Sequence, residues 1–264
     1  MTPLQTAAAA ALSAVAAEDE RLVCVTAGRA GDADPAAAVV AAALPGFGDR
    51  VLAVPGASAR PWVAAGLAET GRRPVLLLEP GAPVPSAAIP GALVVTADQV
   101  VADALLGAGF TVLHPAWPDD VAPLLQAAIA AREPVVLRLH DSATSGPLDP
   151  VDPPVLGRPR ILRSGGEVTL AGSGPTAGLL ADVARMLAGR GARVTAVDQH
   201  TLRPGRGVSL ALFDGALVVG SGDGGVPGRV RRVAVAGEPR QVMEAVFAAV
   251  PSLQPARAAG VREA

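Results

Sequence analysis

Three histidines are the residues of this sequence best suited to proton transfer or to contact with a charged ligand. His114, His140 and His200 each follow a short apolar run of strand length, and open α/β sheets bind ligands at the edge where their strands end. An imidazole changes its charge near neutral pH. It can therefore transfer a proton or bind an anion. Together with Arg138 and Arg203, these side chains are our candidates for substrate or anion contacts. Polar loop residues without a ligand are the alternative interpretation.

The spacing of the histidines argues against two other kinds of chemistry. Metal-binding histidines come at close, regular spacings, whereas these three are far apart in the chain, so we predict no metal site. His140 is followed by Asp141 and Ser142. A hydrolytic triad, however, is assembled from distant positions, because adjacent side chains point in different directions.

Two glycine-rich segments invite comparison with nucleotide-binding loops. Residues 172–178 follow a strand-like run and precede a helical one, where free N–H groups favour an anion. Asp198 comes about 20 residues later, as the ribose-binding acid of dinucleotide folds does. The glycine spacing is off by one residue, and Pro175 removes an N–H donor, so we interpret this segment as a structural turn. Residues 220–225 match G-x-G-x-x-G but precede a poor helix opener, and we interpret them as a surface loop.

Composition removes several further kinds of chemistry. The sequence has no lysine, asparagine or tyrosine, which excludes a lysine Schiff base, a phosphate-loop lysine and a tyrosine general acid. Aromatic residues make up 2% of the chain, the net charge is −2 and the arginines are scattered, so no nucleic-acid partner is expected. Cys24 is the single cysteine and lies in an apolar run. It is expected to be a buried strand residue and excludes an internal disulfide.

The pattern of apolar runs predicts the elements that position these residues. Half of the 264 residues are hydrophobic, mainly alanine, valine and leucine, which suits parallel sheets covered by alanine-rich helices. Strand-like runs alternate with helical ones, so we predict βαβ units. The expected strands are 22–26, 51–54, 75–78, 92–96, 111–113, 134–139, 168–171, 192–197, 216–219 and 232–235. The expected helices are 6–17, 61–69, 97–106, 119–132, 176–188, 210–213 and 238–250, with loops at 29–35 and after 250.

A proline-rich stretch divides the chain. Five prolines lie between residues 147 and 159, and proline favours stiff, open backbone. We therefore expect an α/β fold of two domains, each a mostly parallel sheet flanked by helices, at 1–145 and 161–264, with a linker at 146–160. The N-terminus carries no positively charged leader and no apolar stretch reaches membrane-spanning length. We expect a cytoplasmic protein with no membrane partner.

Several segments, taken in order, resemble the C-terminal half of the transketolase family. Each piece is locally weak, but together they run colinearly over most of the chain. Residues 64–68 (Ala-Ala-Gly-Leu-Ala), 71–74 (Gly-Arg-Arg-Pro), 112–116 and 134–139 are similar to the pyrimidine-binding domain of transketolase and deoxyxylulose-phosphate synthase. Residues 163–174 and 191–204, ending in a Thr-Leu-Arg-Pro turn, resemble the transketolase C-terminal domain.

The resemblance implies a thiamine-diphosphate enzyme whose parts are shared between chains. In the family, a separate N-terminal domain binds the diphosphate through Mg²⁺ and a Gly-Asp-Gly…Asn motif. We expect this domain to be missing here, because residues 222–224 (Gly-Asp-Gly) lie in the wrong domain with no asparagine after them. The pyrimidine-binding domain supplies a glutamate that hydrogen-bonds the aminopyrimidine, and alignment on 64–68 places Ala57 at that position. The short segment from Ile89 to Pro115 implies that the family's histidine-bearing loop is also deleted here.

Two interpretations follow from this resemblance. In the first, the chain is the small subunit of a split transketolase-like enzyme that transfers a two-carbon ketol unit. Thiamine diphosphate and Mg²⁺ then bind only at an interface with a partner carrying the diphosphate-binding domain, in a heteromer that contains a homodimer of this chain. Such a chain is inactive alone, and we assign no catalytic residue to it. In the second, the chain is a degenerate, non-catalytic paralogue with an assembly or regulatory role, which Ala57 favours. A free-standing nucleotide-binding protein is a third interpretation that rests only on the glycine segments.

Overall fold

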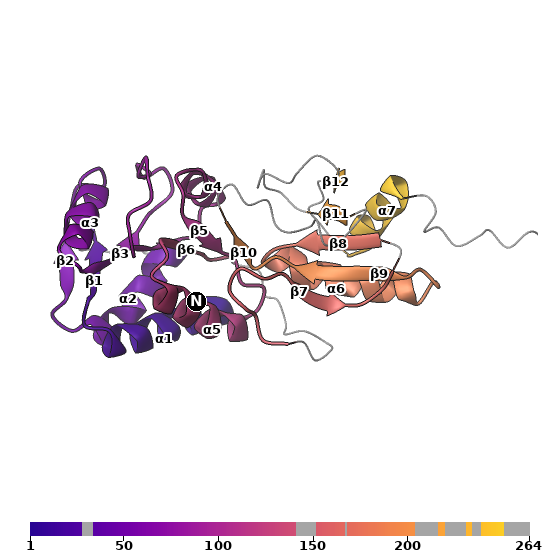
Figure 1. Ribbon diagram of the computed structural model, residues 1–264, viewed down its shortest axis with the longest axis horizontal. Coiled ribbons are helices and arrows are strands. Elements are labelled where there is room, and N and C mark those ends of the chain that lie inside the picture. Colours follow the sequence, from indigo (N-terminus) through magenta and orange to yellow (C-terminus); the bar gives the residue numbers. More distant parts are fainter. Residues whose placement is uncertain are drawn as a thin grey trace, which may run out of the picture.

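The chain folds into two sheets with helices packed against them (Figure 1). The computed structural model describes residues 1–27, 34–140, 152–166, 168–203, 216–219, 231–233 and 239–250, with the backbone alone at 216–219, 231–233 and 239. The helices are α1 (Pro3–Glu18), α2 (Pro35–Phe47), α3 (Arg60–Glu69), α4 (Gln99–Gly107), α5 (Pro118–Ala131), α6 (Pro175–Ala188) and α7 (Pro239–Ala249). The strands are β1 (Leu22–Thr26), β2 (Val51–Ala53), β3 (Arg73–Leu77), β4 (Leu93–Thr96), β5 (Thr111–Leu113), β6 (Val135–Arg138), β7 (Arg160–Arg163), β8 (Val168–Gly172), β9 (Val194–Asp198), β10 (Thr201–Leu202), β11 (Ala216–Val219) and β12 (Arg231–Val233).

The first sheet has the strand order β10-β5-β6-β4-β3-β1-β2. Its strands are parallel except where β10 meets β5. Successive residues of a strand face opposite sides, and both sides are apolar here: Val75 and Leu77 belong to one core and Leu76 to the other. Helices α1, α2 and α5 cover the first side, and α3 and α4 cover the second (Figure 1). Burial on both faces explains why the inner strands β1, β3, β4 and β6 stand out in the sequence as continuous apolar runs.

Helix α2 is the longest element that the sequence analysis does not predict. Most of the predicted loop at 29–35, namely residues 29–33, lies outside the described residues. The loop prediction is wrong at residue 35, because Pro35 is the first residue of α2. A proline is tolerated there since its missing N–H would have no partner. Asp34 begins the helix by accepting the N–H of Ala36 at 2.9 Å. Pro45 lies inside the helix, and its tendency to break helices hid the element in the sequence.

The second sheet has the strand order β12-β11-β8-β9-β7, antiparallel only between β7 and β9. Helices α6 and α7 pack together over one core. Both sheets are therefore mostly parallel and flanked by helices, which confirms the predicted fold class. Strand β7 was not predicted, and its first residue, Arg160, is the last residue of the predicted linker. The predicted helix at 210–213, the segment 220–225 and the chain after 250 lie outside the described residues.

Strand β10 connects the two sheets. The predicted Thr-Leu-Arg-Pro turn is wrong at its first two residues, because Thr201 and Leu202 pair with Leu113 and Val112 at the edge of the first sheet (Figure 1). An open sheet edge offers unpaired backbone groups to any extended segment that reaches it, and the local sequence does not reveal that. The domain limits at 145 and 161 stay a prediction.

Candidate functional site

The three histidines meet where the two sheets join. His114 follows β5, and its N–H donates to the carbonyl of His200 at 2.9 Å. The ring of His140, which follows β6, lies edge-on to that of His114 with centroids 5.7 Å apart. His140 Nε2 donates to the carbonyl of Pro115 at 3.1 Å. Parallel pairing of β5 and β6 places their carboxyl ends side by side. The sequence predicts that each histidine follows a strand, and the strand order shows that the histidines are neighbours. We call this region, with Ser173 and Gly174, the seam.

The first turn of α6 closes onto His114. The imidazole Nδ1 lies 3.0 Å from the hydroxyl of Ser173, and the N–H of Gly174 donates to the carbonyl of His114 at 3.1 Å. Gly174 has φ 55° and ψ −134°, a conformation that residues with a Cβ rarely adopt. A Cβ at this position would also overlap the His114 ring. The ring thus lies against the helix start, which favours a structural role for residues 172–178 over nucleotide binding.

Two buried histidines of the seam are neutral at pH 7. Burial, followed by Arg138 and His140, holds the pKa of His114 well below its usual value. Burial, followed by Arg160, lowers the pKa of His200 to about 4. Nε2 of His114 and Nε2 of His200 have no hydrogen-bond partner among the described residues. Neither ring can serve as a proton donor in its charged form at neutral pH.

The two candidate arginines differ in how their charge is balanced. Arg203 Nη2 donates to Oε1 of Glu133 at 2.7 Å, which forms an ion pair. Arg138, at the end of β6, donates from Nη2 to the uncharged amide oxygen of Gln99 at 3.0 Å. Burial lowers the pKa of Arg138, but a guanidinium keeps its charge at neutral pH. The charges of Asp103 and Asp98 also act on Arg138, but among the described hydrogen bonds of the two arginines only that of Arg203 joins a carboxylate, so Arg138 is the better placed of the two to bind an anion.

A second group of charged residues, which the sequence analysis missed, lies at the carboxyl ends of β1 and β3. The chain runs from β1 to β2 on one side and returns to β3 on the other, and such switch points are the usual ligand sites of open α/β sheets. Here the buried Arg60 donates to the carbonyl of Leu77 at 3.2 Å and lies 3.5 Å from Oε2 of Glu79. Burial raises the pKa of Asp34, and the charge of Glu79 adds to the rise. The visible signal was an acid directly after the predicted strand 75–78.

Ala57 lies at the same edge, half-buried in the turn between β2 and α3. A methyl group can neither accept nor relay a proton, so it does not fit the aminopyrimidine contact that the transketolase resemblance implies. No cluster of three His, Cys, Asp or Glu side chains in the described ranges could hold a metal ion. Position 57 therefore provides no acid–base group for thiamine diphosphate.

Two large apolar side chains that flank this turn in the sequence are exposed. Trp62 of α3 is 80% exposed, and Leu52 of β2 is 40% exposed. Among the described residues, β2 is the edge strand of the first sheet, and an edge strand offers its outer backbone groups for pairing. Exposed large apolar groups next to a free strand edge are typical of a surface that another protein covers.

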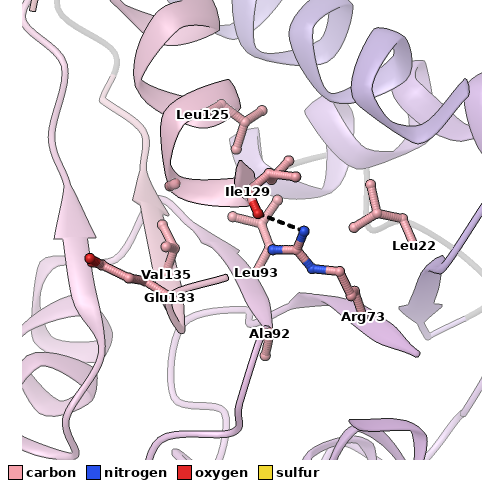
Figure 2. Close-up of a pocket in the computed structure, with 10 residues that line it drawn as sticks. Leu22, Arg73, Ala92, Leu93, Leu125, Ile129, Glu133 and Val135 are labelled. Carbon is pink, nitrogen blue, oxygen red and sulfur yellow. Dashed lines mark hydrogen bonds between the residues drawn. The ribbon is translucent and has the colours of Figure 1, made fainter. Parts of the chain in front are cut away.

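The cavity in Figure 2 lies at the opposite, amino edge of the first sheet. The side chain of Arg73 borders it, and its Nη1 donates to the carbonyl of Ile129 at 2.7 Å. The cavity volume is about 10 Å³, which is room for about one water molecule. The other labelled lining residues are Leu22, Ala92, Leu93, Leu125, Glu133 and Val135. This cavity is too small for a substrate, and we assign it no function.

Comparison with known proteins identifies the fold. No protein-family model matches the sequence, and no curated protein matches it. A split-gene transketolase, described as an inactive β4 tetramer, superposes with a TM-score of 0.71 at 18% identity, over 94% of this chain and 98% of that one. Transketolase from Campylobacter jejuni subsp. jejuni NCTC 11168 gives 0.63 at 15% identity, over 91% of this chain and 44% of that one. A 2-oxoglutarate:ferredoxin oxidoreductase from Magnetococcus marinus gives 0.66 at 12% identity, over 94% and 64%.

These similarities confirm, at the level of the fold, the resemblance to the C-terminal half of transketolase. The chain spans less than half of the Campylobacter enzyme but nearly all of the split-gene chain. In the part of the chain that the structure describes, no helix is long and apolar enough to cross a bilayer.

Proposed function

We propose that this chain is the small subunit of a split transketolase-like enzyme that transfers a two-carbon ketol unit. A partner chain supplies the diphosphate-binding domain, and thiamine diphosphate and Mg²⁺ bind only at the interface of the two. The observation that carries the proposal is coverage: the chain matches 98% of a split-gene transketolase but 44% of an undivided one. When bound, the cofactor would supply the nucleophilic carbon for the transfer.

The carboxyl edge of the first sheet is the proposed interface with the partner. Ala57 lies at this edge, beside the exposed Trp62 and Leu52. Covering both side chains would remove apolar surface from water, which is the main favourable contribution to association. Because Ala57 offers no carboxylate, any acid–base group for the cofactor's pyrimidine has to come from another residue or from the partner.

The seam is the proposed substrate side of the interface. Arg138 donates to an amide oxygen, and the carboxylates of Asp103 and Asp98 act on its charge without a described hydrogen bond to it, so it suits an anionic group of a substrate. His114, His140 and His200 surround the same strand ends. Arg203 does not join them: β10 runs antiparallel to β5, and the ion pair with Glu133 holds Arg203 at the amino end of that strand, so we leave it out of the proposed set. A neutral imidazole can orient a substrate hydroxyl by accepting a hydrogen bond from it.

Self-association and location belong to the same proposal. The split-gene transketolase that this chain resembles is described as a β4 tetramer. We propose that this chain likewise forms a homodimer within the heteromer, in the cytoplasm.

A non-catalytic paralogue is the second candidate, and one observation favours it. Position 57 carries a methyl group where the family resemblance implies a glutamate. On this reading, the chain keeps the fold and the apolar surface for assembly or regulation, and its complexes do not turn over.

Calorimetry with thiamine diphosphate and Mg²⁺ distinguishes the candidates. This chain, a partner chain carrying the Gly-Asp-Gly…Asn motif, and the co-expressed pair would each be titrated. We expect binding only by the pair, followed by ketol transfer in a coupled assay. A pair that assembles but neither binds the cofactor nor turns over supports the paralogue. Absence of any pair contradicts the split-enzyme candidate.

Ala57→Glu sharpens this test. If the site has lost its acid–base group, the variant pair should gain deuterium exchange at the cofactor's reactive carbon. Ala59→Glu is the matched control, because Ala59 is exposed in the same turn. Equal effects of the two substitutions would refute a specific role for position 57.

A further inference from the structure

A buried arginine joins the two sheets through two aspartates. Arg160, the first residue of β7, donates to both carboxylate oxygens of Asp120 on α5, at 2.8 Å from Nη1 and 2.6 Å from Nη2. Its Nη2 also donates to Oδ2 of Asp198, the last residue of β9, at 2.7 Å. Helix α5 packs on the first sheet, whereas β7 and β9 belong to the second. We call Asp120, Arg160 and Asp198 the clasp.

The clasp is buried and its charges do not balance. The exposed fractions of the side chains are 5% for Arg160, 5% for Asp120 and 0% for Asp198. One guanidinium faces two carboxylates, so the fully ionised group carries a net charge of −1. An uncompensated charge away from water is strongly unfavourable. Oδ1 of Asp198 has, in addition, no hydrogen-bond partner among the described residues.

We propose that Asp198 is the proton switch of this clasp: its protonated form holds the second sheet against α5, and its ionised form loosens that contact. Protonation converts the carboxylate to a neutral acid, leaving one cation, Arg160, opposite one anion, Asp120. Oδ2 of Asp198 can still accept from Arg160 in this form. Loss of the proton returns a net charge to a site that water reaches only if the contact opens. The proposal does not depend on the enzyme function proposed above.

The electrostatic surroundings place this switch in the neutral pH range. Burial raises the pKa of Asp198 to about 7; Arg160 opposes the rise and Asp120 adds to it. His200, two residues further along the chain, has a pKa lowered to about 4 by burial and by Arg160, so it stays uncharged as Asp198 titrates. The carbonyl of Asp152 also accepts from Arg160, at 3.2 Å, but a carbonyl does not titrate.

The raised pKa fixes the sign of the pH dependence. In the unfolded chain Asp198 ionises near its ordinary pKa of 3.8, whereas in the folded chain it keeps its proton up to about pH 7. The folding equilibrium constant therefore falls as pH rises between these values, by at most about tenfold per pH unit, and is level above them. Asp198→Asn mimics the protonated side chain and removes this contribution. The histidines contribute equally to the pH dependence of unfolding in the variant and the wild type. The difference between the two therefore isolates the contribution of Asp198.

Tryptophan fluorescence can follow the clasp directly. The chain has two tryptophans, and the ring of Trp117 lies 4.9 Å from the guanidinium carbon of Arg160. In a Trp62→Phe background, Trp117 alone reports on the contact. We expect its emission to change with a midpoint near pH 7, and to stay constant when Asp198→Asn is added. Asp120→Asn should move the midpoint to lower pH, because it removes the negative neighbour.

Two results would overturn the proposal: constant Trp117 emission across neutral pH, or a transition that survives Asp198→Asn. Should that variant fail to fold, carbon NMR of the wild-type aspartate carboxyls decides. One aspartate titrating near pH 7 supports the switch, and none doing so contradicts it. Amide hydrogen exchange distinguishes opening of the contact between the second sheet and α5 from a change confined to the surroundings of Trp117. β7 and β9 should exchange faster above the midpoint, beyond the base-catalysed increase seen at β1 and β3.

Discussion

Gly174→Ala should be among the most destabilising single substitutions in the described chain. The backbone at Gly174 has φ 55° and ψ −134°, and holding a residue with a Cβ there costs roughly 1–3 kcal/mol. The added Cβ would also overlap the His114 imidazole, and crowding in a packed interior costs roughly 1–3 kcal/mol. The two costs fall on the same site, so we expect a loss of roughly 2–6 kcal/mol in the free energy of unfolding. Urea unfolding followed by circular dichroism measures it.

A double-mutant cycle separates the two costs. His114→Ala removes the ring that the new Cβ meets, so adding it to Gly174→Ala should recover the crowding part and leave the backbone part. Gly66→Ala is the matched control. Gly66 lies inside α3, where an added Cβ would meet nothing within 4 Å, and alanine there should stabilise the chain by up to about 1 kcal/mol. A Gly174→Ala variant within about 0.5 kcal/mol of the wild type would refute the reasoning.

Three further predictions concern pH, an ion pair and the thiol. Burial lowers the pKa values of His114 and His200 below their ordinary 6.5, so stability should be full above that pH and fall on acidification, by at most about tenfold per pH unit for each. Unfolding of Asp198→Asn with and without His200→Gln checks this; equal slopes would contradict it. The Arg203–Glu133 pair is about 30% exposed and should contribute only about 0.5 kcal/mol in a double-alanine cycle, with a value above about 2 kcal/mol counting against this estimate. Burial raises the pKa of Cys24 to about 12, so a thiol reagent at pH 8 should label it only after unfolding; fast labelling of the native chain would disprove its burial.

The strands were predictable because their burial is two-sided. Residues 75–78 and 93–96 lie in a sheet with a helix layer on each face, so every position is apolar and the run stands out without alternation. Cys24, predicted as a buried strand residue, is buried in β1. Helix α2 was not predicted, because the Pro45–Gly46 pair is typical of the end of a helix. The helix continues to Phe47, which is buried in the core.

The clasp shows the limit of the same reasoning. Asp119 and Asp120 are the first two residues of the predicted helix 119–132, and both lie in the first turn of α5. Nothing local distinguishes them, yet Asp120 is buried against Arg160, 40 positions away. Arg160 in turn stood at the end of a predicted linker. An ion pair between distant elements depends on their packing, and neither residue type nor spacing encodes that packing.

By itself, the sequence determined the α/β class, most of the elements and the resemblance to the C-terminal half of transketolase. These follow from apolar periodicity, turn residues and the order of segments, all of which are local or colinear. Only the tertiary structure decided that β10 joins the first sheet, that three histidines share one seam, and that one guanidinium serves two carboxylates. Such relations arise from strand order and burial, because side chains distant in sequence meet only after the sheets have formed.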